Sequence, residues 1–266
     1  MITNQVHIDQ MGNQVILPNK PLRIVSLVPS QTELLYSLGL TDEVVGQTLF
    51  CIHPKVMHIE KPRICGTKKL DLDKIRALHP NLIIGNKEEN TREQIEELQK
   101  EFPVWMSDIH NLDQALDMIT KIGALVQKPA KAQEISLQIL SDFKGLVRTE
   151  IPQKCLYLIW REPWMAAGNN TFINDLLERM GFQNVLKHLP ARYPALSAKE
   201  IELANPNCLF LSSEPYPFKE KHLAELKNIC PHAQIKLVDG ELFSWYGSRL
   251  LHSAKYLKNL QDDLLY

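Results

Sequence analysis

The sequence lacks an excess of charge of either sign and any long run of apolar residues. Its 30 lysines and arginines are balanced by 31 aspartates and glutamates, which leaves a formal net charge of −1. A nearly neutral chain presents no strong positive field to nucleic acid or to an anionic membrane. No apolar run approaches the roughly 20 residues of a transmembrane helix. We therefore expect no nucleic-acid partner and no membrane span within these 266 residues.

The chain also lacks the motifs of common catalytic and cofactor sites. None of its 11 glycines belongs to a phosphate-binding loop, and there is no Gly-x-Ser-x-Gly nucleophile motif. The nine histidines include no His-x-His or His-x-x-x-His pair, and the five cysteines are not closely spaced. We therefore predict no catalytic residue, no resident metal or cofactor, and reduced thiols that pack as small apolar side chains.

Strand and helix patterns alternate in the first and last parts of the chain. Apolar runs such as "RIVSLV" at 23–28 and "NLIIGN" at 81–86 are typical of strands buried on both faces. Amphipathic segments at 71–78 and 91–102 predict helices, and Ser30 with Glu33 fits a capping box at the start of another. A hairpin is expected at 6–17 and a short strand at 63–66. The alternation predicts an α/β fold with mostly parallel sheets.

The middle of the chain, residues 111–147, shows no strand pattern. Apolar residues recur there with helical spacing in two segments, the second beginning at Pro129. That second helix is expected to be about 20 residues, or about 30 Å, long, with Ile135, Ile139, Leu140, Phe143 and Val147 on one apolar face. We therefore expect two Rossmann-like lobes, 1–111 and 151–266, joined by a helical linker at 112–150 that contains a long, rigid helix.

Two pairs of segments resemble each other across this linker. "LDLDKIRALHPNLIIG" at 70–85 and "LSAKEIELANPNCLFL" at 196–211 each combine a short helix, a Pro-Asn pair and an apolar strand. "ELLYSLGL" at 33–40 resembles "DLLERMGF" at 175–182. Because the two pairs occur in the same order, the sequence predicts two related lobes.

Aromatic residues concentrate in the expected loops of the second lobe. Loops at the carboxyl ends of parallel strands meet at one edge of a sheet, where ligands bind. Rings in several such loops predict a wall for a large, flat ligand, and packing at the end of the sheet is the alternative. Arginines among them could pair with ligand carboxylates or phosphates. The aromatic residues are Trp160, Trp164, Tyr193, Trp245 and Tyr246, and the arginines are Arg161 and Arg249.

Several motifs together resemble one known family. They are "KPLRIVSLVPSQTELLYSLGL" at 20–40, the segment at 70–85, the helical middle and "YGSR" at 246–249. The chain is similar over essentially its whole length to substrate-binding proteins of ABC importers, in the class for cobalamin, ferric siderophores and haem. "DQMGNQVILP" at 9–18 is similar to the mature start of that family, and its cobalamin-binding branch looks nearest.

The resemblance implies a non-enzymatic protein that captures a metal chelate between two lobes joined by a long helix and delivers it to a permease. The cobalamin branch commonly has an aromatic residue near Thr67, where this chain reads "GTKK", and Lys68 with Lys69 would favour an acidic chelate instead. The ligand-contacting residues that the resemblance and the loop positions imply are Ser30, Gln31, Thr32, Phe50, His53, Thr67, Lys68, Asn86, Trp160, Arg161, Trp164, Tyr193, Trp245, Tyr246, Ser248 and Arg249.

The resemblance also implies a monomer that docks on its permease through one acidic residue of each lobe. The matching positions are Asp73 and Glu200, with Glu202 as an alternative. Residues 1–20 show no basic-then-apolar pattern, so we expect no signal peptide within this chain. The protein would be periplasmic or membrane-tethered if a leader is missing from it, and cytoplasmic otherwise. Two alternatives remain. The first is an intracellular two-lobed protein without a transport role, which could be an enzyme, a metal-cluster protein or a chelate-handling protein. The second is a protein that binds free Zn or Mn directly.

Overall fold

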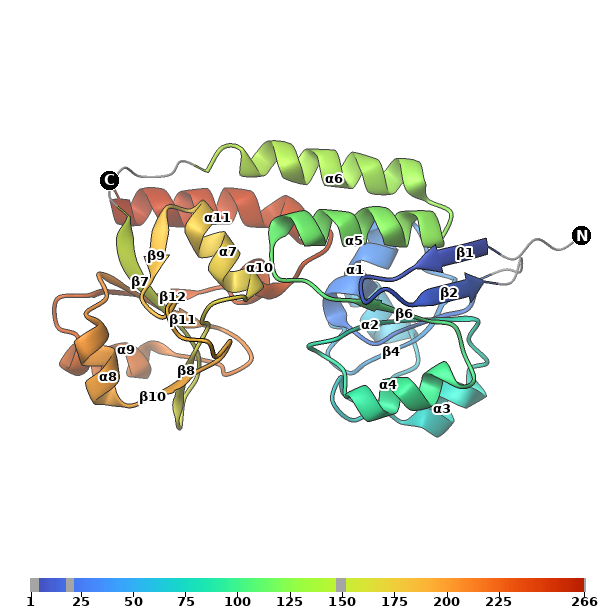
Figure 1. Cartoon of the computed structure of the whole chain (residues 1–266), viewed down its shortest axis with the longest axis horizontal. Helices are drawn as coiled ribbons and strands as arrows, with labels where there is room; N and C mark the ends of the chain where they lie inside the picture. The colour runs from blue at the N-terminus through green and yellow to red at the C-terminus, as the bar shows by residue number, and fades with distance from the viewer. Residues whose placement is uncertain (1–4, 18–21, 147–151, 266) are drawn as a thin grey trace, which may run out of the picture. The chain divides into compact units, whose positions relative to one another are not determined.

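The computed structural model of the chain describes residues 5–17, 22–146 and 152–265, which form two compact α/β units (Figure 1). Unit 1 comprises Met1–Asp108, Asp113–Leu137 and Tyr246–Arg249, as far as these are described. Unit 2 comprises Ile109–Leu112, Gln138–Trp245 and Leu250–Tyr266. The expected α/β class with two lobes is confirmed. The boundaries at 111 and 150 stay a prediction.

Unit 1 is built on a fully parallel four-stranded sheet with the order β4-β3-β5-β6. The sequence runs expected to form buried strands do so, and every residue of β5 is buried. Helices α3 and α4 pack on one face through Ile75, Ile95 and Leu98. The elements are β3 (Ile24–Ser26), α1 (Pro29–Ser37), β4 (Val44–Gln47), α2 (Lys55–Glu60), α3 (Leu72–Ala77), β5 (Leu82–Asn86), α4 (Arg92–Gln99) and β6 (Val104–Ser107).

The predicted N-terminal hairpin is present as β1 (Gln5–Ile8) and β2 (Gln14–Leu17). Its turn is organised by Asp9, whose Oδ1 accepts hydrogen bonds from the backbone N–H groups of Met11 and Asn13. The turn also lies against β6, because Gln10 N–H donates to the carbonyl of Met106 at 3.0 Å. The short polar turn therefore attaches the hairpin to the sheet of unit 1.

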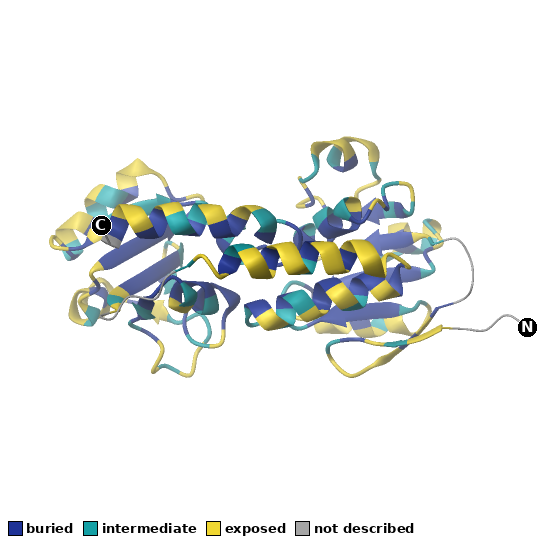
Figure 2. Cartoon of the chain, turned by 90° about the horizontal axis from the view of Figure 1, so that it is seen from above, coloured by how far each residue is buried: buried dark blue, intermediate teal, exposed yellow. Residues whose placement is uncertain are grey.

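Two helices, α5 (Leu112–Leu125) and α6 (Pro129–Phe143), form the helical middle of the chain. Figure 2 shows buried residues on one side of α6 and exposed residues on the other. Of the apolar face expected for this helix, Ile135, Ile139 and Phe143 are buried, whereas Leu140 is 38% exposed. α6 has 15 residues, fewer than expected. Val147, the expected end of this helix, lies outside the described residues. The rigidity of the helix stays a prediction.

Unit 2 is built on a six-stranded sheet with the order β10-β8-β7-β11-β12, in which β9 also pairs with β7. β9, β7, β11 and β12 are parallel, and β8 and β10 add antiparallel pairs. Leu156 and Leu158 face a core that includes Ile201 and Leu226, whereas Tyr157 points to the opposite face, where its ring makes a tilted contact with Phe243. The elements are β7 (Gln153–Trp160), β8 (Trp164–Ala166), α7 (Phe172–Arg179), β9 (Phe182–Asn184), β10 (Ala195–Leu196), α8 (Ala198–Ala204), β11 (Cys208–Ser212), α9 (Glu220–Ile229), β12 (Gln234–Val238), α10 (Glu241–Ser244) and α11 (Leu250–Leu265).

The internal repeat predicted from the sequence has a structural counterpart. In unit 1, the side chain of Asn81 accepts a hydrogen bond from the backbone N–H of Arg23 at 2.8 Å. In unit 2, the side chain of Asn207 accepts one from the backbone N–H of Lys154 at 2.9 Å. In both repeats the asparagine of the Pro-Asn pair thus joins the start of one parallel strand to the start of its neighbour. This supports the duplication of a single α/β unit.

Three local expectations were wrong. Residues 63–66 form isolated bridges rather than a strand, at Gln47–Arg63 and Cys65–Leu70. No side-chain cap is present at the start of α1, because the helix begins one residue earlier, at Pro29, with Val28 as its N-cap. The loop expected after Trp160 contains β8, and the short helices α2 and α10 were not expected. Each of these short elements depends on packing partners rather than on its own periodicity.

Candidate functional site

The first turn of α1 lies directly after β3, at the carboxyl edge of the sheet of unit 1. Ser30, Gln31 and Thr32 are all buried there. The hydroxyl of Thr32 lies 2.7 Å from Ser26 Oγ and 3.1 Å from Cys51 Sγ. These hydrogen bonds tie the turn to β3 and to the loop after β4. The turn is therefore a pre-ordered part of the sheet edge, and direct ligand contact by its side chains stays a prediction.

A hydrogen-bond network around Ser107 holds Asn86 at the same edge. Ser107 Oγ accepts from Gln31 Nε2 at 2.6 Å and from Asn86 Nδ2 at 2.9 Å. Asn86 Oδ1 in turn accepts from the backbone N–H groups of Glu88 and Glu89. Both the amide donor and the amide acceptor of Asn86 are thus used within unit 1. Asn86 shapes the loop that leaves β5.

The loop after β4 presents apolar side chains to solvent. Phe50 is 58% exposed, and Leu49 and Ile52 beside it are also exposed. A Cβ at Gly66 would lie 3.1 Å from Phe50 Cε2, so the Cys65–Lys68 loop supports this ring closely. His53 follows in the same loop and is half-buried. This loop offers an exposed ring at the edge where Ser30 to Thr32 and Asn86 lie.

Thr67 and Lys68, the other two predicted ligand contacts in the first part of the chain, lie beside this loop. Thr67 is buried, and its carbonyl accepts a hydrogen bond from Asn90 Nδ2 at 3.1 Å. Lys68 is exposed, and its ammonium group donates to the carbonyl of Glu88. The segment of Lys68 is therefore joined to the loop that leaves β5.

The segment Tyr246–Arg249 belongs to unit 1 although it lies between α10 and α11 in the chain. Arg249 forms a bidentate ion pair with Glu33 of α1, with Nε–Oε2 and Nη2–Oε1 distances of 2.8 Å. The segment runs close to the α1 turn, since a Cβ at Gly247 would lie 2.7 Å from the carbonyl oxygen of Ser30. The guanidinium group that we expected to meet a ligand is therefore engaged by a carboxylate of unit 1.

Two buried hydroxyls of the predicted set have unused hydrogen-bonding capacity. Ser30 Oγ and Ser248 Oγ have no hydrogen-bond partner among the residues that the structure describes. Both belong to unit 1, and both side chains are almost fully buried. Tyr246, also in this segment, is 7% exposed.

In unit 2, the β7–β8 hairpin carries Trp160, Arg161 and Trp164. Trp160 is 41% exposed and packs edge-on against Tyr216, with ring centroids 5.6 Å apart. Trp164 is buried and stacks on Phe218. The register of β7 and β8 pairs Trp160 with Met165, beyond the last parallel pair of β7 with β11 at Leu158. Trp160 is thus the ring of this hairpin that is open to a ligand.

Arg161 is held between a ring and a carboxylate. Its guanidinium carbon lies 4.5 Å from the centroid of the Trp164 ring. Its Nη2 and Nε donate to Glu225 at 2.6 and 3.1 Å. These hydrogen bonds hold the pKa of Arg161 above its ordinary value. Like Arg249, this arginine forms an internal ion pair.

Trp245 follows α10 and is 7% exposed. Its indole Nε1 donates to Glu214 Oε1 at 2.9 Å, and the same oxygen accepts from Ser244 Oγ at 2.7 Å. Glu214 follows β11, at the carboxyl edge of the sheet. Burial, together with the nearby Glu241 and Asp239, raises the pKa of Glu214 above its ordinary value.

Tyr193 lies on the other side of the β8 strand, just before β10. Its neighbour Arg192 accepts a backbone hydrogen bond from Gly168 at 2.7 Å, and the Arg192 guanidinium carbon lies 5.6 Å from the Tyr193 ring centroid. The ring is half-buried. Tyr193 therefore lies beside the loop that precedes α7.

Sequence reasoning missed the residues that hold the expected ones in place. Glu33 engages Arg249, Glu225 engages Arg161, Tyr216 packs on Trp160, and Glu214 engages Trp245. Glu214 could have been found by the rule that identified Trp160, because it too follows a parallel strand at the carboxyl edge. The other three give no local signal, since they lie on helices or in a polar loop.

The proposed docking residues differ in how far their carboxylates are free to act. The side chain of Asp73 is 94% exposed and pairs with Arg76 at 3.0 Å. The Glu200 carboxylate accepts hydrogen bonds from the backbone N–H and the hydroxyl of Ser197, which lower its pKa, and the Glu200 backbone N–H donates to Ser197 Oγ to complete a capping box. Glu202 pairs with Lys199. Docking by these residues stays a prediction.

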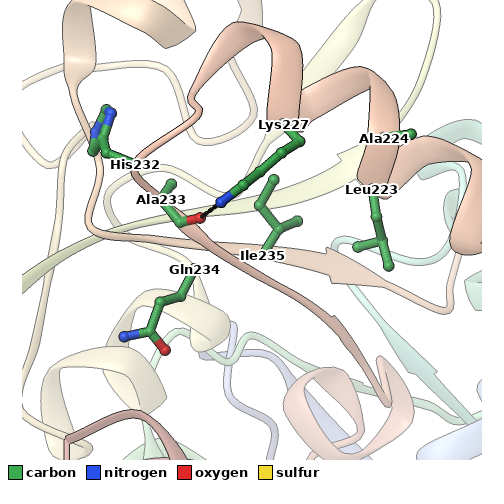
Figure 3. A pocket seen from close by; sticks show the side chains of 7 residues that line it. All are labelled: Leu223, Ala224, Lys227, His232, Ala233, Gln234 and Ile235. Atoms are coloured by element: carbon green, nitrogen blue, oxygen red, sulfur yellow. Dashed lines mark hydrogen bonds between the residues drawn. The ribbon is translucent and has the colours of Figure 1, made fainter.

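Two surface hollows of about 390 Å³ each lie in unit 2, away from the expected ligand residues. Figure 3 shows the first, where Lys227 donates to the carbonyl of Ala233 beside His232 and Gln234. His232 and Gln234 also line the second, with Gln153 and Asn207. These residues start or precede β7, β11 and β12, so the hollows lie at the amino edge of the sheet, opposite the edge of Trp160 and Glu214.

Residues 5–17, 22–146 and 152–265 contain neither a cluster of metal-ligating side chains nor a membrane-spanning helix. No group of three or more histidines, cysteines, aspartates or glutamates is placed there to hold a metal ion. None of the helices in this part of the chain combines the length and apolar character needed to cross a membrane.

Comparison with known proteins gives consistent matches over both units. The chain is 24% identical over 206 residues to the vitamin B12-binding protein of Vibrio parahaemolyticus, covering 75% of this chain and 74% of the relative. It is also 24% identical over 267 residues to an uncharacterized ABC transporter substrate-binding lipoprotein, YvrC, of Bacillus subtilis, covering 95% and 84%.

Solved structures show the same fold. The periplasmic vitamin B12 binding protein BtuF of Vibrio cholerae matches with a TM-score of 0.78 and 20% identity, covering 92% of this chain and 98% of that one. The periplasmic haem-binding protein RhuT of Roseiflexus sp. RS-1 matches with a TM-score of 0.80 and 21% identity over the same shares. The sequence model described as periplasmic binding protein matches residues 24–228, which is most of the chain. The chain therefore belongs to the periplasmic binding protein family.

Proposed function

We propose that this protein is the solute-binding component of an ABC importer and that its cargo is a metal chelate, either cobalamin-like or ferric. It acts by binding and release and carries out no reaction. The chelate is cargo, and the protein has no resident cofactor. The observation that carries the proposal is the match of residues 24–228 to a family of binding proteins, because this range includes the carboxyl ends of β3, β5, β7 and β11, where loops leave the parallel strands.

The side chains at these edges support a ligand with a large apolar or aromatic face. Phe50 and Trp160 are large, exposed rings on loops that leave parallel strands. Arg161 and Arg249 already pair with Glu225 and Glu33. Affinity therefore comes mainly from ring contacts and from a few hydrogen bonds, to which the hydroxyls of Ser30 and Ser248 contribute.

The partner and the location follow from the same assignment. The protein is a monomer that docks on an ABC permease through Asp73 of one unit and Glu200 or Glu202 of the other. It works in the periplasm or tethered to the outer face of the membrane. Acidic docking residues steer association with a basic surface, and this attraction weakens as salt screens it.

The test is a direct binding experiment with three chelates. The purified protein is incubated separately with cyanocobalamin, haem and a ferric siderophore, desalted, and examined by absorption spectroscopy. We expect one of the three to co-elute in a 1:1 ratio and titration to give saturable binding. Bovine serum albumin, run in parallel, reports nonspecific haem adsorption. Retention of none of the three would contradict the proposed cargo.

A further inference from the structure

Glu214 contacts the indole of Trp245 at the carboxyl edge of unit 2. One carboxylate oxygen, Oε1, accepts from both Trp245 Nε1 and Ser244 Oγ. Gly240 makes room for this arrangement, since a Cβ there would lie 2.6 Å from Glu214 Cγ and 3.0 Å from Glu214 N. The carboxylate is thus closely fitted between the end of β11 and the start of α10.

The two donors depend on Glu214 to different degrees. Ser244 Oγ also lies 2.9 Å from the carbonyl of Gly240, so its proton has a second acceptor. An indole N–H is a donor only, and a hydrogen bond to a charged carboxylate is roughly twice as strong as one to a neutral acceptor. The charge on Glu214 therefore matters more to the orientation of Trp245 than to that of Ser244.

The surroundings make this charge sensitive to pH. Within the part of the chain that the structure describes, the carboxylates of Asp239 after β12 and Glu241 on α10 both act on Glu214 with negative charge. Tyr157 of β7 donates to Ser212 Oγ, and Tyr256 of α11 accepts from the backbone N–H of Asp239. Burial of Glu214 and the two carboxylates raise its pKa above the ordinary value, while Ser244 and Trp245 oppose that shift.

We propose that Glu214 is a positioning residue: its carboxylate holds the Trp245 indole in the orientation that meets the ligand, and affinity falls when that carboxylate takes up a proton. The affinity part rests on the proposed function and on the expectation from the sequence that Trp245 contacts the chelate. The positioning part concerns the ligand-free protein and can be tested without a chelate.

The positioning part is tested by following the indole N–H signals in ¹H–¹⁵N spectra of the ligand-free protein as pH is lowered. The chain has four tryptophans, and Trp245→Phe identifies the signal of Trp245. We expect that signal to titrate with a midpoint above the ordinary glutamate pKa of about 4.3. Glu214→Gln should abolish the titration. Glu241→Gln should move the midpoint to lower pH, because it removes one of the negative charges that raise the pKa.

The affinity part is tested with cyanocobalamin and haem over the same pH range. Glu214→Ala should weaken binding about tenfold at neutral pH, as loss of a charge-assisted hydrogen bond predicts. Glu214→Gln keeps an acceptor, so it should stay within about threefold of wild type and lose the acid-side decline. Glu96→Gln, at an exposed helical site, is the matched control and should keep the wild-type profile.

The outcomes separate the two parts. The positioning role is overturned if the indole N–H signal of Trp245 does not change with pH, or if it titrates in Glu214→Gln as it does in the wild type. A wild-type pH profile of binding in Glu214→Gln overturns the affinity role. If neither cyanocobalamin nor haem binds, both the affinity role and these two cargo assignments are contradicted. The positioning role is still supported in that case if the Trp245 indole signal titrates in the wild type and no longer does so in Glu214→Gln.

Discussion

Arg249 and Glu33 form a bidentate ion pair in which both side chains are largely shielded, with exposed fractions of 13% and 15%. The pair joins the Tyr246–Arg249 segment to α1. Removing one partner of a shielded pair leaves the other charge without compensation, which costs far more than the loss of a surface pair. The pair is therefore a structural connection within unit 1.

Replacing Arg249 by Met should lower the free energy of unfolding by about 3 kcal/mol, because the Glu33 carboxylate stays largely shielded from water and unpaired. Urea denaturation measures the change. The double variant Glu33→Gln/Arg249→Met should lose less than the sum of the two single variants. The control is Arg92→Ala, which breaks an exposed pair with Glu96 and should cost about 0.5 kcal/mol or less. Equal effects of Arg249→Met and Arg92→Ala would contradict the structural role.

Trp160 allows a test of ring contacts with the ligand. Its side chain is 41% exposed, and its ring packs edge-on against Tyr216. Trp160→Ala should weaken chelate binding about threefold to tenfold, because an aromatic pair contributes about 0.5–1.5 kcal/mol beyond buried area. Titration by fluorescence or absorption measures it. Leu203→Ala removes an exposed apolar side chain from α8, away from the expected ligand residues, and should leave affinity unchanged. If Trp160→Ala binds the chelate with wild-type affinity, the ligand does not contact this ring.

At the scale of elements, the same short motif has two different outcomes. Ser-x-x-Glu occurs at 30–33 and at 197–200. At 197–200 it forms a complete capping box at the start of α8. At 30–33 it forms none, because Pro29 begins α1 one residue earlier and Glu33 pairs with Arg249 instead. A local signal for a cap is thus overridden where a distant arginine competes for the carboxylate.

The packing of α5 against α6 depends on a glycine. A Cβ at Gly123 would lie 2.1 Å from the Cβ of Ala132, which is too close for two carbon atoms. In an isolated helix, replacing Gly by Ala stabilises by up to about 1 kcal/mol. Overpacking at a close contact costs about 1–3 kcal/mol, so here the sign reverses. Both residues belong to unit 1, and their contact fixes how closely the two helices approach.

Gly123→Ala should therefore destabilise the protein by about 1–2 kcal/mol in thermal or urea unfolding. The compensating variant Gly123→Ala/Ala132→Gly restores the space and should recover most of that loss. Ala132→Gly alone should cost about 1 kcal/mol through helix propensity. If the effects of the two substitutions simply add, the close contact does not limit the packing of these helices.

At the scale of the whole molecule, the five cysteines are all free thiols with different accessibility. Cys51, Cys155, Cys208 and Cys230 are buried, whereas Cys65 is intermediate. Burial raises the pKa of each of the four, to about 11 for Cys208. Because the thiolate is the reactive form, burial and a raised pKa both slow reaction with a thiol reagent.

We expect one thiol to react quickly with a disulfide reagent at pH 8 in the native protein, and all five after unfolding in guanidinium. The fast thiol is Cys65, so Cys65→Ser should remove the fast phase and leave the slow reaction of the other four. Absorbance of the thiolate released by the reagent gives the number of reactive thiols in the native protein and in the unfolded protein. Rapid reaction of two or more thiols in the native protein would show that the cores of the units open more readily than their packing indicates.

The sequence by itself determined the α/β class, the two related units and most of the strands. These features follow from local patterns: buried strands read as short apolar runs, and helices show their period within about two turns. The repeat at 70–85 and 196–211 predicted equivalent structures, and Asn81 and Asn207 make the same strand-joining hydrogen bond. The loops after parallel strands also predicted that a ligand would bind at the carboxyl edges of the sheets.

Only the tertiary structure decided which partner each of these side chains has. Arg249 and Glu33 are 216 residues apart in the chain, and Trp245 and Glu214 are 31 apart. No periodic pattern links positions at such separations, and each polar group takes whichever complementary group the fold brings within hydrogen-bond distance. The tertiary structure therefore turned two expected ligand arginines into ion-pair partners and identified Glu214, because burial makes an unpaired charge too costly to leave.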